Sequence, residues 1–341
     1  MQDDLFGPLD GVPPLSKSPR SRNAGVRAVT PSAELLELAH TLPAQLRMGV
    51  STWSYPGWNG LVWDGVYDES VLSRKGLTAL SAHPLMRTVS VDRSFWRPLT
   101  VEQYAQMSAQ VTEDFRFLVK CPNVITDAWV RSEEGKGQRH NPSFLAPNLA
   151  LDQFVIPAMQ GLGNKLGVLV FQLSPLPWEW LNQPQALFER LGNMLAATRY
   201  ALQTAPNVIV AVELRDPSLL GQPFVEILRA HGATMCLGLH GKMPPIDEQL
   251  KTLRQFWPTP LVCRWNLNHS FGPLGYPLAQ EKHKPFNEIR SPDPYTRHVL
   301  AKTILGICGA GQPAFVTISN DAEGCAPLSI GLLAQQLKTI S

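Results

Sequence analysis

Charged and amide side chains close most of the apolar runs in this sequence. In the run IVAVELR, residues 209–215, Glu213 and Arg215 share the period-two phase of Ala211, so their side chains face the same way. A charged pair on an apolar strand is costly unless the charges are paired or face a polar cavity. The pattern therefore allows either a structural ion pair or a reactive site. Other runs end in the same manner, at Asp92, Lys120, Gln172, His240, Arg264 and Asn320.

General acid/base chemistry on a negatively charged substrate is the reaction type that this set of residues favours. Glu213 is the candidate acid or base, and Asp92 is the second carboxylate. Lys120, Arg215 and Arg264 are expected to stabilise negative charge. Substrate binding is expected of the remaining polar strand ends, Gln172, His240 and Asn320.

A metal site is the alternative use of the acidic residues and the histidine. Asp92, Glu213, His240 and Asp321 have the side-chain types that hold a divalent metal and its water. None of the spacings H-x-H, H-E-x-x-H or D-x-D occurs in the chain. The sequence thus shows no cofactor motif, and it allows a metal without providing a motif for one.

The segment that follows the first apolar run is rich in aromatic residues. Trp53, Tyr55 and Trp58 are spaced closely enough to form a wall on which a sugar or a base can stack. The alternative is that these rings pack at the rim of the fold. We expect the first arrangement and assign the three residues to substrate binding.

Eight apolar runs alternate with amphipathic stretches, and this alternation predicts how the polar residues are positioned. Eight strands and their helices in about 290 residues favour a (β/α)8 TIM barrel, in which all strand ends form one mouth. A doubly wound sheet is less suitable because no G-x-G-x-x-G turn follows a strand. The predicted strands are residues 47–53, 87–95, 115–120, 166–173, 207–215, 233–239, 260–266 and 314–320.

The composition describes a globular α/β protein with an additional N-terminal segment. The chain has 341 residues, a formal charge of +2 and only 17% charged residues, so it has no global attraction to nucleic acid. Five scattered cysteines predict buried, reduced thiols, and the lack of a signal sequence or long apolar run predicts a cytoplasmic protein with no membrane partner. Residues 1–33 are rich in Pro, Ser and Arg and are expected to form a flexible tail, followed by one barrel domain over residues 34–341.

The predicted tail contains a short peptide that indicates a different class of function. Gln2, Leu5 and Phe6 fit the pattern Q-x-D-L-F, by which bacterial proteins dock on the replicative sliding clamp. In such a contact the leucine and phenylalanine enter an apolar pocket, and the glutamine bonds to its rim. Docking on the sliding clamp, or an accessory role at DNA, is therefore an alternative partner prediction.

Several motifs together resemble the YecE-like family, domain of unknown function 72. They are GVSTWSYPGW at 49–58, FRFLVK at 115–120, FQLSP at 171–175, VELRDP at 212–217 and Asn320. The resemblance implies a TIM barrel and supplies no activity. The sequence departs from the family at residues 89–96, where Ser90 stands in place of the usual glutamate and Asp92 follows two positions later. The usual Arg-Leu-His-Gly near the seventh strand is here Arg264-Trp265-Asn266-Leu267.

These observations predict an enzyme that acts at the mouth of the barrel. We expect hydrolysis or general acid/base chemistry on a polar small molecule, such as a phosphate-bearing, nucleotide-like or sugar-containing one. The alternatives are the clamp-docking protein and a barrel that binds a ligand without turnover, which the loss of the glutamate at Ser90 favours.

Overall fold

Eight parallel strands form a closed barrel in the computed structural model, which describes residues 25–132 and 137–340. The strands follow each other around the barrel in the order β1-β10-β9-β8-β7-β6-β3-β2. Each of the eight predicted runs overlaps one of these strands, so the predicted TIM barrel is confirmed. Their bounds are β1 Leu46–Val50, β2 Thr88–Val91, β3 Arg116–Lys120, β6 Leu166–Gln172, β7 Ile209–Glu213, β8 Thr234–Leu239, β9 Leu261–Trp265 and β10 Ala314–Ile318.

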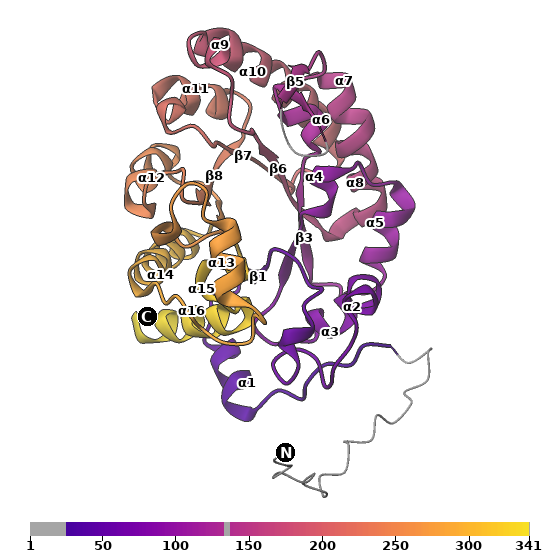
Figure 1. Ribbon diagram of the computed structural model, residues 1–341. Coiled ribbons are helices and arrows are strands. Elements are labelled where there is room, and N and C mark those ends of the chain that lie inside the picture. The colour runs from indigo at the N-terminus through magenta and orange to yellow at the C-terminus, as the bar shows by residue number, and fades with distance from the viewer. Residues whose placement is uncertain (1–24, 133–136, 341) are drawn as a thin grey trace, which may run out of the picture.

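Helices surround the barrel, as Figure 1 shows. Helix α5 begins at a capping box, in which Thr100 and Gln103 bond to each other's backbone N–H, as their spacing predicts. The larger helices are α1 Ala33–His40, α2 Glu69–Lys75, α5 Val101–Ser108, α8 Ile156–Leu162, α10 Pro184–Ala201, α11 Gln222–Ala230, α12 Ile246–Leu253, α13 Tyr276–His283, α14 Pro294–Gly309 and α16 Ala326–Ile340. The shorter ones are α3 Leu77–Ser81, α4 Arg93–Trp96, α6 Asn123–Thr126, α7 Pro147–Ala150, α9 Trp178–Leu181 and α15 Asn320–Glu323.

The long segment after β3 contains structure that the sequence pattern does not reveal. Strands β4 (Trp129–Arg131) and β5 (Gly137–His140) form a two-stranded antiparallel sheet outside the barrel. Both strands are short, and β5 is exposed throughout, so they lack the alternation of apolar residues by which strands are predicted.

The N-terminal boundary of the packed domain lies before the predicted one at residue 34. Val26 is buried, Ala28 bridges to Trp63, and Arg27 pairs with Asp64. These residues therefore belong to the packed structure. The predicted clamp-docking peptide, Gln2 to Phe6, lies outside the described residues.

Two apolar cores hold the barrel together. The larger one fills the space between the strands and the helices, and the five cysteines are buried and free. The smaller one plugs the inside of the barrel, where Phe315 lies over Gly167 and a methyl group on that glycine would come within 2.8 Å of the ring. The members of this inner plug are Leu118, Val168, Val170, Ile209, Ala211, Cys236, Val262 and Phe315.

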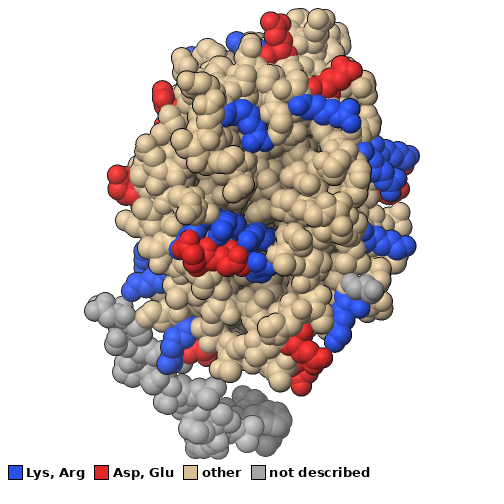
Figure 2. Space-filling model, turned by 180° about the vertical axis from the view of Figure 1, so that it is seen from behind, with Lys and Arg blue, Asp and Glu red and all other residues tan. Residues whose placement is uncertain are grey.

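Charged side chains are sparse on the face of the molecule that Figure 2 shows. Figure 2 views it from behind relative to Figure 1 and shows mostly uncharged surface, with blue and red atoms gathered near the centre. At the N-terminal ends of the strands, Arg47 and Arg87 both pair with Asp114. Within the described residues, no helix is long and apolar enough to cross a membrane.

Candidate functional site

A layer of polar side chains lies directly above the inner plug. Side chains alternate between the two faces of a strand, so a residue two positions after a member of the plug also points into the barrel. Lys120 follows Leu118 in this way, and Glu213 follows Ala211. The same rule brings Gln172 and Arg264 to the inner face. Register places Gln172 beside Glu213, and Gly238 beside Arg264.

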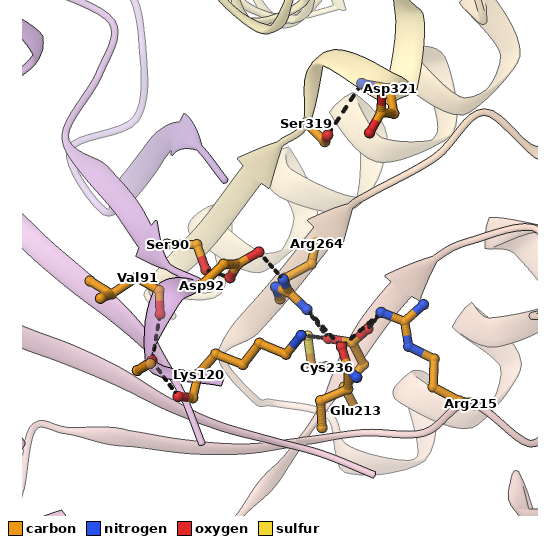
Figure 3. A network of polar contacts seen from close by, with 12 residues as sticks. Ser90, Val91, Asp92, Lys120, Glu213, Arg215, Cys236, Arg264, Ser319 and Asp321 are labelled. Carbon is orange, nitrogen blue, oxygen red and sulfur yellow. Dashed lines mark hydrogen bonds and ion pairs between the residues drawn. The ribbon is translucent and has the colours of Figure 1, made fainter. Parts of the chain in front are cut away.

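Glu213 lies at the centre of this layer, completely buried between two arginines (Figure 3). Arg264 Nη1 donates to Glu213 Oε2 at 2.6 Å. Arg215 Nη2 lies 2.7 Å from Glu213 Oε1, an ion pair whose angles are not those of a hydrogen bond. Gln172 Oε1 accepts from both arginines, at 2.8 Å from Arg215 and 3.3 Å from Arg264. The predicted pair of Glu213 and Arg215 is therefore one part of a larger buried network.

The electrostatics of this network keep Glu213 ionised. Burial opposes the ionisation of its carboxyl group, but Arg215, Arg264 and Lys120 outweigh burial and hold its pKa at about 2. The pKa of Arg264 is shifted upward. Burial alone would lower it, but the nearby carboxylates of Asp92 and Glu213 outweigh burial. At neutral pH, Glu213 is thus a fixed negative charge.

Asp92 joins the network from the end of β2. Its Oδ2 accepts from Arg264 Nη2 at 2.7 Å, and its Oδ1 accepts from Ser90 Oγ at 2.6 Å (Figure 3). Ser90 thus orients the acidic residue that comes two positions later.

Lys120 is the one cation of the layer that does not pair with a carboxylate in the described structure. Its Nζ lies 3.6 Å from the centre of the Phe95 ring, a cation–π contact. The side chain is largely buried, with 8% of the residue exposed. Burial and the nearby Arg264 lower the pKa of its amine to about 7, against the smaller opposing effects of Asp92 and Glu213.

A cavity of about 540 Å³ opens above the polar layer, and we call it the mouth cavity. Lys120, Gln172 and Arg215 reach it from the strand ends, and Lys242 reaches it from the loop after β8. Its described lining contains three cationic side chains and no carboxylate. The other lining residues are Trp96, Pro175, His240, Pro273, Leu274, Tyr276 and Pro277.

His240 forms a wall between the mouth cavity and a second cavity of about 530 Å³. Its Nδ1 accepts a hydrogen bond from the backbone N–H of Lys242 at 3.1 Å. Burial and Arg215 lower the pKa of its ring to about 3, so the ring is neutral at pH 7. In a neutral ring whose Nδ1 accepts, Nε2 carries the proton and can donate it to a ligand.

The prediction that an aromatic wall binds substrate is wrong for its two tryptophans. Trp53 and Trp58 are buried, and their indole N–H groups bond within the protein, to Ser73 O and Asn320 Oδ1. Tyr55 is partly buried and packs on Trp58 and Phe286. These rings form part of the barrel rim, the alternative that the sequence also allowed.

Asn320 supports this rim and does not line the mouth cavity. Its Oδ1 also accepts from the backbone N–H of Ala326 at 2.8 Å, which fixes the turn between α15 and α16.

The aromatic side chains that line the mouth cavity, Trp96 and Tyr276, are not among the predicted site residues. Trp96 is 76% exposed, and Tyr276 packs on His240 at 5.2 Å between ring centres. Trp96 directly follows the second strand run, so its place near a strand end was the only signal available. Tyr276 begins α13 and Lys242 lies in the loop after β8, and sequence patterns do not predict where the segments between strands and helices place such residues.

The acidic residues and histidine of the metal alternative do not form one cluster. Asp321 lies apart from Glu213 and Asp92 in Figure 3. Across residues 25–132 and 137–340, no group of three or more His, Cys, Asp or Glu side chains is arranged to hold a metal ion.

Comparisons with known proteins point to one family and one fold. The family model described as protein of unknown function DUF72 matches residues 47–340. A DUF72 family protein from Enterococcus faecalis superimposes with a TM-score of 0.54 at 14% identity, covering 86% of this chain and 95% of that one. A DUF72 family protein from Thermotoga maritima superimposes with a TM-score of 0.53 at 18% identity, covering 86% of this chain and 98% of that one.

A solved structure outside the DUF72 proteins has the same fold. A D-tagatose 3-epimerase-like protein gives a TM-score of 0.51 at 12% identity, with 86% of this chain and 98% of that chain covered. At such low identity the likeness is one of fold alone. No curated protein matches the sequence.

Proposed function

This chain belongs to the DUF72 family, and we propose that it is an enzyme. In this proposal, the enzyme binds an anionic small molecule in the mouth cavity. It acts on this molecule by general acid/base chemistry, with Lys120 as the group that takes up and releases a proton. The observation that carries this proposal is the amine of Lys120, which is buried, has no carboxylate partner in the described structure and opens onto a cavity lined by further cations.

The charge of the mouth cavity argues for an anionic ligand. Arg215 and Lys242 line it together with Lys120, and their positive charges face the same space. A phosphate or carboxylate group on a small molecule, including a sugar phosphate, would satisfy these donors, since charge-assisted hydrogen bonds to such groups are strong. Exposed Trp96 and Leu274 offer an apolar rim for the rest of the molecule.

The proposed roles differ from those expected from the sequence for Glu213. A carboxylate with a pKa of about 2 and no exposed surface is a poor proton carrier near pH 7. Glu213 acts instead as a positioning residue, which holds Arg215 and Arg264 in place. Asp92 has the same role toward Arg264 from the other side.

Lys120 is suited to proton transfer because its pKa of about 7 lies near the working pH. An amine that is half protonated at this pH serves as base in one state and as acid in the other. His240 lines the cavity with a neutral ring that carries a proton on Nε2, and this donor would polarise a carbonyl oxygen or stabilise an alkoxide.

The proposal can be tested by binding and by proton exchange. Phosphate, phosphorylated sugars and sugar acids are titrated calorimetrically, and the sugar compounds are then incubated with enzyme in D₂O and followed by NMR for deuterium incorporation at carbon. We expect binding of at least one anion and exchange at a carbon next to its carbonyl or acid group. General acid/base groups contribute about 10²- to 10⁴-fold, so K120M should lower the exchange rate by at least about 100-fold.

The matched control is K251M, on an exposed lysine of α12 that pairs with Glu248 outside the mouth cavity. This variant should keep the binding and the exchange of the wild-type enzyme. Binding of none of the anions, or equal exchange rates in K120M and wild type, would contradict the proposal.

A further inference from the structure

Lys120 differs from other lysines of the chain in the contacts of its amine. Lys165 donates to two backbone carbonyls, of Ser108 and Val111, and Lys251 pairs with Glu248. By contrast, the Nζ of Lys120 makes no hydrogen bond or ion pair with any residue in the described part of the chain, and it rests on the Phe95 ring. Its free side faces the mouth cavity.

The amine lacks a carboxylate partner because arginines occupy both nearby carboxylates. Arg264 and Arg215 take the two oxygens of Glu213. Arg264 and Ser90 take the two oxygens of Asp92. The carboxylates of the polar layer therefore pair with its arginines, and Lys120 lies beside these ion pairs without a carboxylate of its own in the described structure.

This arrangement favours the neutral form of the amine. A lysine that is desolvated and placed next to another cation loses its proton readily and becomes a nucleophile. With a pKa of about 7 in place of 10.5, about half of the Lys120 amines are neutral at pH 7, against about three in ten thousand for an ordinary lysine.

We propose that Lys120 Nζ forms an imine with the carbonyl carbon of a substrate that also carries a carboxylate or phosphate group. This inference rests on the proposed function, because the same mouth cavity must bind the acidic group. Arg215 and Lys242 would hold that group while the carbonyl carbon approaches Lys120.

The reaction needs no reagent beyond the amine and the carbonyl compound. The nitrogen lone pair attacks the carbonyl carbon, a C–N bond forms, and the oxygen takes a proton to become a hydroxyl. The nitrogen then loses a proton, the hydroxyl leaves as water after protonation, and a C=N bond remains. His240 lines the same cavity, and the proton on its Nε2 is available to the oxygen.

Trapping the imine on the full-length protein tests the inference. The protein is incubated at pH 7 with pyruvate, dihydroxyacetone phosphate or acetone, each with sodium cyanoborohydride, which reduces an imine to a stable secondary amine. Peptide mapping by mass spectrometry then locates the label. We expect Lys120 to be labelled at least about tenfold more than Lys242, given the excess of neutral amine at Lys120.

The three carbonyl compounds distinguish the source of the acidic group. Labelling with pyruvate indicates a carboxylate substrate, and labelling with dihydroxyacetone phosphate indicates a phosphorylated one. Acetone carries neither group, so an equal yield with acetone would overturn the requirement for an acidic group.

Two variants complete the test. Lys251 is exposed and pairs with Glu248 outside the mouth cavity, so K251M should leave the labelling of Lys120 in place. K120R keeps a positive charge but removes the nucleophile and should lose the label.

The map of wild-type protein decides the question even where a variant folds poorly. Labelling spread evenly over surface lysines, or absent from Lys120, would overturn the imine. The anion binding and deuterium exchange of the proposed function would stand unchanged in that case, so the two failures are distinguishable.

Discussion

Replacing Glu213 by glutamine keeps the shape of the side chain and removes one negative charge from a completely buried position. In the wild-type protein, this charge lies 2.6 Å from Arg264 and 2.7 Å from Arg215. Its pKa of about 2, in place of 4.5, corresponds to about 3 kcal/mol of folding stability, since one pKa unit is about 1.4 kcal/mol. We therefore expect E213Q to lower the free energy of unfolding by about 3 kcal/mol at pH 7.

The pH dependence of this loss has a definite sign. A carboxyl whose pKa is lower in the folded than in the unfolded protein stabilises the fold above its unfolded pKa, and this contribution is lost as the pH falls toward the folded value. For Glu213 the window runs from about pH 4.5 down to about pH 2. Glutamine does not titrate, so the difference between wild type and E213Q should shrink to about 1 kcal/mol at pH 3.

Urea unfolding between pH 3 and pH 7, followed by circular dichroism, measures this difference. A second reading is the pH at which the amine of Lys120 is half labelled by an acylating reagent. Glu213 raises the pKa of that amine, so E213Q should move the midpoint below the wild-type value of about 7.

The matched control is E323Q, another completely buried carboxylate, which pairs with Arg297. Glu323 is not among the groups that influence the pKa of Lys120, so E323Q should leave the labelling midpoint unchanged. Equal stability of E213Q and wild type at pH 7, or a difference that stays constant down to pH 3, would refute the reasoning.

Three further substitutions and one control probe the barrel and its rim by urea unfolding. A Cβ on Gly238 would lie 2.9 Å from Glu213 Oε1, so G238A should cost about 1–3 kcal/mol, whereas G306A, with no atom within 4 Å of the new Cβ, should cost nothing. Burial raises the pKa of Asp321 from 3.8 to about 6, so its charge destabilises the fold as the pH rises from about 4 to about 6. D321N should therefore gain about 3 kcal/mol at pH 7 and nothing below pH 4. T100A removes the N-cap of α5 and should cost about 1 kcal/mol.

The position of the polar layer could be predicted because it follows from local periodicity and barrel geometry. Lys120, Glu213 and Arg264 each stand two residues after an apolar residue that faces the inside of the barrel. In a closed parallel barrel, side chains with this phase at the ends of strands meet in one layer. The predicted strands alone therefore indicated that these three side chains lie in one layer.

The partners within this layer, and the lining above it, could not be predicted in the same way. Whether Glu213 pairs with Lys120 or with Arg264 depends on the stagger of neighbouring strands by a few ångströms. The burial of Trp58 depends on Asn320, which lies 262 positions away in the chain. Such contacts are set by the path of loops in three dimensions, and no periodic pattern in the sequence records them.

The inner plug and the charged layer are different sets of side chains at different heights of one barrel. Removing a single member of the charged layer leaves an unmatched buried charge, but replacing the layer as a set need not. The plug beneath, from Leu118 to Phe315, contributes no charge to the layer and keeps the strands together without it. Proteins that share this barrel can therefore keep the residues of the inner plug while the residues of the charged layer change to support a different reaction. Protein engineering can likewise vary the charged layer and leave the plug unchanged.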